Sequence, residues 1–185
     1  ILTFTDEKNV EVEFIAELPR NTEPSTNWRE AAWSIKNGYP RCVCLFEERL
    51  YYGGTKQEPN KIWGSAINAW DVFYDGQDLD TSPVSFKVTS SDILQWMLPT
   101  NLLAMGTEGS EWTLGSEDST TPISPLNIPK AIKQSRNGSC RLQPVFVGDT
   151  IVYVQQFGKI VREFGYNWQQ QKFQSPDLTQ LSEEI

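Results

Sequence analysis

Glycine and proline interrupt this chain at intervals too short for an amphipathic helix of several turns. Its 185 residues include 12 glycines and 11 prolines. The segments between them alternate apolar and polar side chains, and residues 10–14, with the sequence Val-Glu-Val-Glu-Phe, show this most clearly. Alternation with a period of two places one face of a strand against a core and the other face in solvent. The sequence therefore predicts an all-β, antiparallel fold.

The predicted strands fall into three groups of four that follow an N-terminal pair. The pair comprises residues 2–4 and 10–14, and a polar connector at residues 19–27 follows it. The three groups comprise residues 41–46, 49–52, 61–67 and 72–74, then 84–89, 93–98, 102–106 and 111–114, and finally 142–147, 151–155, 160–166 and 168–173. Groups of roughly 35–45 residues have the period of propeller blades. We therefore expect a partial β-propeller of about three four-stranded units, with a β-sandwich as the alternative.

The stretches outside these groups complete the predicted organisation. Residues 28–35 fit either one or two helical turns or a strand that packs aromatic side chains. Residues 116–134 are rich in Ser, Thr and Pro and predict a long excursion, with a short helical turn at residues 128–134. We divide the chain into N-terminal strands and connector at residues 1–36 and a propeller-like domain at residues 37–185. Because the chain opens without a methionine, we expect both to be parts of a longer protein.

The charge of the chain is acidic and dispersed. The sequence contains 16 Lys and Arg against 24 Asp and Glu, a net charge of −8, and its basic residues occur singly or in pairs. A surface that grips nucleic acid needs clustered cations to neutralise phosphates, so we expect no tight DNA binding. The sequence does not exclude an acidic wall past which DNA slides without being bound. No apolar run approaches the ~20 residues that span a bilayer, so we expect no membrane insertion.

The absence of histidine is the strongest restriction on chemistry. It removes Ser-His-Asp and Cys-His catalysis, the zinc-protease helix and histidine-based metal centres. Cys42 and Cys44 lack the two-residue spacer and the second cysteine pair of a structural zinc site. They fall on the same face of a predicted strand, and with Cys140 they make an odd number. We expect three reduced, buried thiols of a protein made in a cytoplasm.

The acidic residues offer two weaker candidates for chemistry. Asp75, Asp78 and Asp80 lie close together, but they lack the spacing and the terminal Glu of a calcium loop. Glu108 and Glu111 are the best-placed pair of carboxylates for glycoside hydrolysis, although other surface acids would look the same. A solvated acidic loop and a surface pair are the simpler interpretations. We therefore name no catalytic, metal-binding or cofactor-binding residue, expect no cofactor, and expect a protein that is not an enzyme.

Aromatic side chains are abundant in this sequence, which contains seven Trp, six Tyr and nine Phe. Packing in cores and interfaces explains most of them, because each ring buries a large area. Aromatic residues at sheet ends also stack sugars in carbohydrate-binding modules. The tryptophans that keep this second interpretation open are Trp63, Trp70, Trp96, Trp112 and Trp168.

Four stretches, in order, resemble the tail nozzle family of short-tailed bacteriophages, also called tail tubular protein B or phage stabilisation-type proteins. They are Asn37-Gly38-Tyr39-Pro40-Arg41 with residues 48–55; Ile62-Trp63-Gly64-Ser65 with Phe73; residues 93–99, 102–103 and 107–112; and residues 144–149 and 152–155 with Gly158, Arg162-Glu163, Tyr166 and Asp177-Leu178-Thr179. The resemblance spans roughly residues 37–179 and is carried by the order and spacing of the stretches. Cys42 and Cys44 replace the more usual aliphatic residues, and both are small and apolar enough to pack in their strand.

The resemblance implies a segment of the nozzle's propeller-like body in a phage or prophage. It implies a structural protein of the virion tail, made in the cytoplasm of the bacterial host. Copies of the protein would form a homo-oligomeric ring, six-fold by the resemblance, below the portal and its adaptor. Genomic DNA would leave through the lumen without sequence-specific binding, and tail fibres or spikes would dock outside.

Two other functions compete with this interpretation. The first is a carbohydrate-binding β module for attachment to a host surface, which predicts exposed Trp with acid or amide side chains around one site. The second is a hydrolase, which predicts a cleft with paired carboxylates of perturbed pKa. A ring component instead predicts apolar or aromatic patches on two opposite flanks of a polar domain.

Overall fold

The computed structural model describes residues 3–4, 10–11, 31–74, 79–115, 122–128 and 130–180. It divides the chain after Ala31 into the units Ile1–Ala31 and Ala32–Ile185. In the first unit, β1 (Thr3–Phe4) pairs with β2 (Val10–Glu11) in antiparallel register. These short strands fall within the two predicted N-terminal segments. The connector at residues 19–27 lies outside the described residues.

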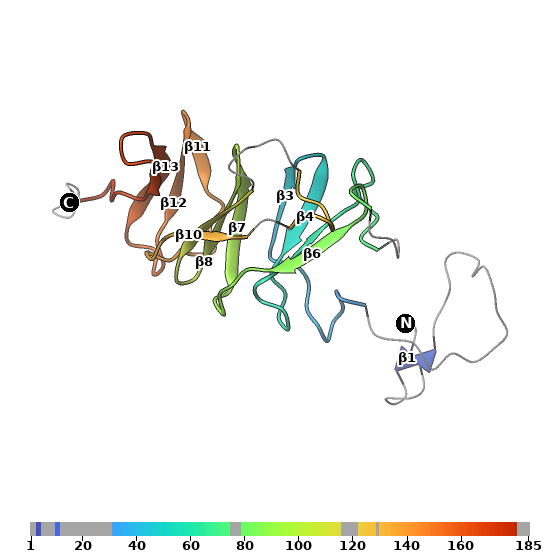
Figure 1. Ribbon diagram of the computed structural model, residues 1–185. Coiled ribbons are helices and arrows are strands. Elements are labelled where there is room, and N and C mark those ends of the chain that lie inside the picture. The colour runs from blue at the N-terminus through green and yellow to red at the C-terminus, as the bar shows by residue number, and fades with distance from the viewer. Residues whose placement is uncertain are drawn as a thin grey trace. The chain divides into compact units, whose positions relative to one another are not determined.

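The second unit contains three four-stranded antiparallel sheets (Figure 1). The first sheet is β3 (Cys42–Phe46), β4 (Arg49–Gly53), β5 (Lys61–Gly64) and β6 (Val84–Lys87). The middle sheet is β7 (Leu94–Pro99), β8 (Leu103–Thr107), β9 (Glu111–Leu114) and β10 (Ile132–Ser135). The third sheet is β11 (Val145–Val147), β12 (Thr150–Val154), β13 (Val161–Asn167) and β14 (Lys172–Gln174). Consecutive strands are neighbours in every sheet, and the described residues contain no helix, so the all-β antiparallel prediction is confirmed.

The membership of the sheets differs from the predicted groups at two strands. Residues 84–87 complete the first sheet by pairing with β5, whereas the sequence predicted that they open the second group. Residues 72–74 form no strand, because the backbone N–H of Ala66 donates to the Val72 carbonyl at 2.8 Å and closes a turn there. Alternation locates a strand, but it does not say which sheet the strand joins.

One prediction of a local helical turn is also wrong. The helical turn expected at residues 128–134 is replaced by β10, in which Ile132 lies opposite Thr113 and Lys133 lies opposite Trp112. For residues 28–35, where a helical turn and a strand were both open, only residues 31–35 are described; they contain no helix, and Ser34 forms an isolated bridge with Gly38. The pairing energy of an open sheet edge overrides the weak local preference of such short segments.

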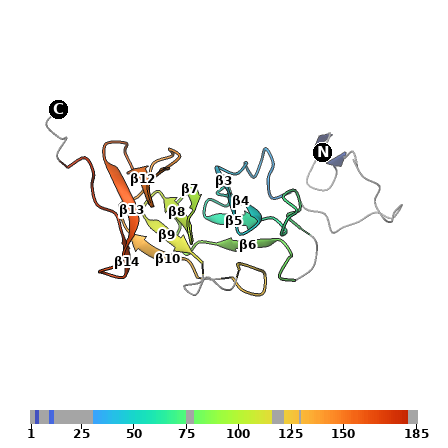
Figure 2. The same ribbon diagram turned by 90° about the horizontal axis from the view of Figure 1, so that it is seen from above.

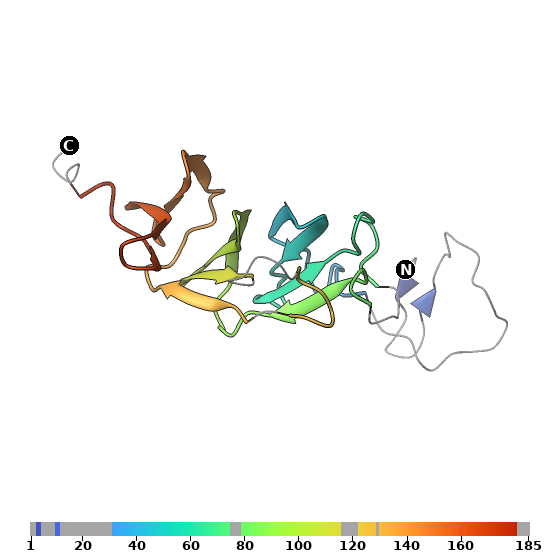
Figure 3. The ribbon, with the colours of Figure 1, turned by 45° about the horizontal axis from the view of Figure 1, so that its top comes forward.

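The middle sheet is buried on both of its faces. Met97, Leu103 and Met105 pack into one core with residues of the first sheet, among them Tyr51 and Ile62. Trp96, Leu98 and Ala104 point the other way and form a second core with Ile151, Tyr153 and Phe164 of the third sheet. Figures 2 and 3 show β7–β10 between the other two sheets. Continuous burial along β8 and β9 follows from this sandwiched position.

Gly106 allows the second core to close. A Cβ atom at this position would lie 2.2 Å from Cε2 of Trp96 and 2.6 Å from Oγ of Ser139. Only the missing side chain lets the indole lie against the backbone of β8. The glycine therefore sets the packing distance between the middle sheet and the Trp96 ring.

Gly106→Ala is expected to lower the free energy of unfolding by roughly 1–3 kcal/mol, because the added methyl overpacks the core. Gly148→Asn is the control: Gly148 has a φ of +62° with no atom near the position of its Cβ, and asparagine tolerates this conformation. Urea unfolding followed by fluorescence measures both. Equal midpoints for the two variants would contradict the expectation.

Residues 122–127 return from the middle sheet to the first sheet, and we call them the return segment. Its turn is closed by reciprocal backbone hydrogen bonds between Ser124 and Asn127, at 3.1 and 3.0 Å. Ile123 is buried in the core of the first and middle sheets, and its N–H donates to the Glu47 carboxylate at 3.0 Å. Ser124 Oγ donates to Asp80 Oδ1 at 2.8 Å. This part of the predicted excursion therefore fastens the first sheet to the middle one.

Candidate functional site

The surroundings of Cys42 and Cys44 indicate a packing role and no reactive one. Cys42 and Cys44 lie on the core face of β3, as the sequence predicted, and all three cysteines are free. Burial, together with the neighbouring Cys44, raises the pKa of Cys42 to about 12, and burial raises the pKa of Cys44 to about 12. Both thiols therefore hold their protons at neutral pH, which makes them poor nucleophiles.

Native protein at pH 8 is expected to leave Cys42 and Cys44 unmodified by iodoacetamide, whereas denatured protein reacts fully. The folded state binds these protons more tightly than the unfolded state, whose thiols have a pKa of 9.0. The stabilisation is thus complete below pH 9 and is lost as the pH rises toward 12. Peptide mass mapping measures the labelling, with the half-buried Cys140 as the internal comparison. Rapid labelling of Cys42 in folded protein would contradict the burial.

The fold places the two predicted acidic candidates in different environments. Glu108 is exposed, whereas Glu111 is fully buried and accepts hydrogen bonds from the Ser135 hydroxyl, from Ser139 Oγ at 3.0 Å and from the Asn137 N–H at 3.3 Å. Glu111 therefore fixes the loop that leads from the middle sheet to the third. In this arrangement its oxygens are engaged by the protein itself.

The aspartates of the acidic loop show no assembled site in the described part of the chain. Asp75 and Asp78 lie outside the described residues. Asp80 binds Ser124, as above, and its backbone carbonyl accepts a hydrogen bond from Arg49. Across the described ranges, no group of three or more His, Cys, Asp or Glu side chains is placed to hold a metal ion.

Arg49 is a fully buried arginine inside the first sheet. Its Nη1 donates to the carbonyls of Ser65 and Ser82, at 2.6 Å each, and its Nη2 donates to the carbonyl of Asp80. Desolvation lowers the pKa of Arg49 from its ordinary value, although the guanidinium stays charged. The side chain therefore anchors both ends of the long loop between β5 and β6.

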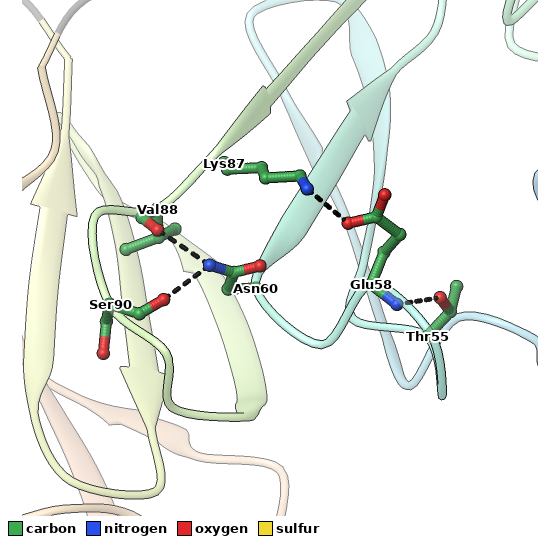
Figure 4. Close-up of polar contacts among 6 residues, drawn as sticks. All are labelled: Thr55, Glu58, Asn60, Lys87, Val88 and Ser90. Carbon is green, nitrogen blue, oxygen red and sulfur yellow. Dashed lines mark hydrogen bonds and ion pairs between the residues drawn. The ribbon is translucent and has the colours of Figure 1, made fainter.

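The turn between β4 and β5 is tied to the segment that enters the middle sheet (Figure 4). Asn60 Nδ2 donates to the carbonyls of Val88 and Ser90, at 3.1 and 2.5 Å. Lys87 Nζ lies 2.7 Å from Glu58 Oε2 in a partly exposed ion pair. Such partly exposed pairs contribute little to stability, so the two hydrogen bonds of the part-buried Asn60 amide do more to join the turn to this segment.

The third sheet exposes an apolar face on the side away from the middle sheet. Ile151 and Tyr153 of β12 point into the second core, so their alternate neighbours point outward. Register places Val145 opposite Val152, Thr150 opposite Val147, Glu163 opposite Val152 and Val161 opposite Val154. We call the following five side chains the valine face: Val145, Val147, Val152, Val154 and Val161.

The first sheet also exposes apolar side chains on its outer side, the side away from the middle sheet. Leu45 lies opposite Leu50, and Val43 lies opposite Tyr52, which in turn lies opposite Trp63. These five residues form what we call the first-sheet outer face: Val43, Leu45, Leu50, Tyr52 and Trp63. Trp33 packs edge-on against Tyr52, Trp63 and Phe73 with ring centroids 4.9, 5.8 and 4.9 Å apart, and so covers its β5 side. Val43 and Leu45 are left 49% and 52% exposed.

The five candidate tryptophans have different positions. Trp63, Trp96 and Trp112 are buried, which removes them from any sugar platform, and Trp70 and Trp168 are 56% and 83% exposed. Trp168 meets Tyr166 edge-on with centroids 4.9 Å apart. Amide side chains of the same hairpin form hydrogen bonds with one another. Asn167 Nδ2 donates to Gln174 Oε1 at 3.2 Å, and Gln174 Nε2 donates to Gln170 Oε1 at 2.5 Å.

Within the described residues, no helix has the length and apolar character needed to cross a bilayer. No protein-family model matches the chain, and no curated protein matches it significantly.

Proposed function

We propose that this chain is a structural component of a phage or prophage virion tail, part of the nozzle below the portal and its adaptor. The observation that carries the proposal is a stack of three sheets that ends in an apolar face on each side. Solvent-facing sheet surfaces are normally polar, so such faces favour a protein that works in an assembly. The four stretches that resemble the nozzle family supply the kind of assembly.

The blade-like construction of the sheets supports the propeller part of this proposal. Each sheet is a four-stranded meander, and β3 lies against β7 while β10 lies against β14. A two-layer sandwich covers each sheet on one face only, whereas the middle sheet here is covered on both. We therefore favour propeller-like blades over the β-sandwich alternative.

The charge of the chain supports a conduit that does not grip its cargo. With a net charge of −8 and no cluster of cations along the sequence, the chain repels a polyanion over a Debye length of about 8–10 Å. DNA would pass such a wall without sequence-specific binding. Portal adaptor and tail fibre or spike proteins are the expected neighbours.

Gold-labelled antibodies against this chain provide the test of the tail assignment. Short-tailed virions produced by the source bacterium, with prophages induced, are examined by electron microscopy. Label confined to the tail vertex is the expected result, and cross-linking of those particles identifies the neighbours. Virions that carry label elsewhere, or purified virions without any label, would overturn the assignment.

A carbohydrate-binding module is the second candidate, and the hairpin between β13 and β14 favours it. This hairpin presents the exposed Trp168 and Tyr166 next to the amides of Asn167 and Gln174. Exposed rings can stack on sugars while amides bind hydroxyl groups. Binding of host surface polysaccharide that Trp168→Ala abolishes and Trp70→Ala leaves intact would establish this function. Equal binding by both variants, or none by the wild type, would exclude the hairpin as a sugar site.

A further inference from the structure

We propose that the fold gathers a basic patch beside the turn between β4 and β5, and that this patch binds a short acidic segment of a different protein. The patch consists of four cations and one aromatic residue: Lys36, Tyr39, Arg41, Lys56 and Arg141. The inference goes beyond the proposed function, because it concerns neither DNA nor a further copy of this chain. It applies equally to a tail protein and to a carbohydrate-binding module.

The segment before β3 packs against the turn between β4 and β5. The Gln57 N–H donates to the Asn37 carbonyl at 3.2 Å. A Cβ atom at Gly38 would lie 2.7 Å from Cβ of Lys56, so the two backbones are in direct contact. The exposed patch residues on these two segments are Lys36, Tyr39 and Lys56. All three therefore lie at this contact or within two residues of it along the chain.

Two arginines that are distant in the chain meet beside the same turn. The N–H of Arg41 donates to the Gly53 carbonyl, where the turn begins, at 2.9 Å. Arg141 belongs to the connector between β10 and β11, and its side chain is exposed. Burial and the neighbouring Cys44 raise the pKa of Cys42 to about 12, and the charges of Arg141 and Arg41 both oppose this rise. Both guanidinium groups therefore lie near the Cys42 thiol.

The patch has no neutralising carboxylate. Residues 31–46 contain no Asp or Glu, and the turn at residues 54–60 contains only Glu58. The Glu58 carboxylate is already occupied by Lys87, at 2.7 Å (Figure 4). Within the described ranges, that contact is the only ion pair, so no described carboxylate pairs with a cation of the patch. A bound anion would relieve the repulsion among these like charges.

The charge of the whole chain favours a short acidic segment over nucleic acid. The net charge is −8, so the surface outside the patch is more acidic than the chain as a whole. Duplex DNA carries a charge for about every 1.7 Å of its axis and would extend past the patch onto that acidic surface. A peptide with a few carboxylates ends within the patch. Arg41 and Arg141 also offer the planar fork that binds a carboxylate through two hydrogen bonds.

Exposed apolar surface next to the cations refines the expected partner. Ile35 is 93% exposed and Tyr39 is 63% exposed. Both side chains precede Arg41 on the segment that packs against the turn. A peptide that alternates acidic and apolar residues can pair with the cations and cover these two side chains at once. Phosphates offer nothing to Ile35, which again favours a peptide.

Fluorescence anisotropy with the 185-residue chain tests the proposal. The probe is a labelled peptide of sequence Glu-Glu-Leu-Glu-Asp-Phe-Glu, and its control is the peptide Gln-Gln-Leu-Gln-Asn-Phe-Gln. A thymidine octanucleotide is the third probe. Wild type is expected to bind the acidic peptide with a Kd on the order of 10–100 μM at low salt. Binding should weaken as salt is raised, and the other two probes should bind at least about tenfold more weakly.

Charge reversal locates the binding surface. Lys56→Glu and Arg141→Glu change exposed side chains of the patch, and each is expected to raise the Kd for the acidic peptide at least about tenfold. Lys172→Glu makes the same change in net charge on an exposed lysine of β14, outside the patch. Its Kd should stay within about twofold of wild type, because the effect is local. Circular dichroism checks that all variants fold.

Four results would overturn the proposal. The first is a wild type that does not bind the acidic peptide. The second is tighter binding of the octanucleotide, which would show a surface for nucleic acid. The third is an equal loss of binding in Lys172→Glu, which would show an effect of net charge alone. The fourth is self-association of wild type that Lys56→Glu abolishes, measured by analytical ultracentrifugation, which would show that the patch binds a second copy.

Discussion

Arg49→Leu is expected to lower the free energy of unfolding by roughly 3–5 kcal/mol. Leucine fills part of the space but donates no hydrogen bond. The buried carbonyls of Ser65 and Ser82 would then be left without the guanidinium, and the part-buried hydrogen bond to the Asp80 carbonyl would be lost as well. The unpartnered Nε of Arg49 already costs some stability, which keeps the expected loss below the sum of three charged hydrogen bonds.

Two further variants make the measurement specific. Arg49→Lys keeps the charge but not the planar fork, so it should fall between wild type and Arg49→Leu. Arg136→Leu removes an exposed arginine and is expected to change stability by less than about 0.5 kcal/mol. Guanidinium unfolding at several wavelengths supplies the free energies. If Arg49→Leu unfolds at the same midpoint as Arg136→Leu, the buried network contributes nothing and the account of the long loop is wrong.

Trp96→Ala is expected to lower the free energy of unfolding by roughly 3–5 kcal/mol, because it empties the centre of the second core. The indole is buried and lies 5.7 Å, centroid to centroid, from the ring of Tyr153. Ile151 and Phe164 share this core. The cavity would lie between the middle and third sheets, away from the core that holds the first sheet.

Hydrogen exchange locates the damage. Amides of β11–β14 should lose protection in Trp96→Ala, while those of β3–β5 keep most of theirs. Trp168→Ala, which removes a largely exposed indole, is the matched control and should leave both sets unchanged. Uniform loss of protection across all three sheets would mean that the two cores unfold as one cooperative unit. The idea that each core can be destabilised separately would then be wrong.

Most strand positions were predictable from the alternation of apolar and polar side chains, although a bulge between Leu94 and Trp96 breaks the period of two in β7, and β8 and β9 are buried on both faces. Residues 111–114 of the predicted pattern coincide with β9, and 49–52 fall within β4. Even the placement of Cys42 and Cys44 on one face followed from alternation. The sequence did not predict strand pairing across long loops. β6 pairs with β5 after the loop that Arg49 anchors, and β10 pairs with β9 across the predicted excursion.

The surfaces were harder to predict than the strands. Alternation does not say which side of a strand meets another layer, so the valines of β11 and β12 could be assigned to strands but not to an exposed face. Arg49 reads as an ordinary surface residue, because its carbonyl partners lie 16 to 33 residues away in the chain. Ile123, among serines and prolines, gave no sign of burial. The exposed Trp168 and the buried Trp96 are indistinguishable by composition alone.

The return segment has a consequence for biosynthesis. During translation, the strands of the first sheet can pair as soon as residue 87 has left the ribosome, since no later strand belongs to that sheet. Its core, however, is completed only by Ile123 and Ala131, and the hydrogen bond from Ile123 to Glu47 spans 76 residues of chain. The nascent first sheet must therefore wait, with apolar surface uncovered, until the middle sheet has been synthesised. A pause in elongation before residue 123 would prolong that exposure, and one placed after residue 131 would not.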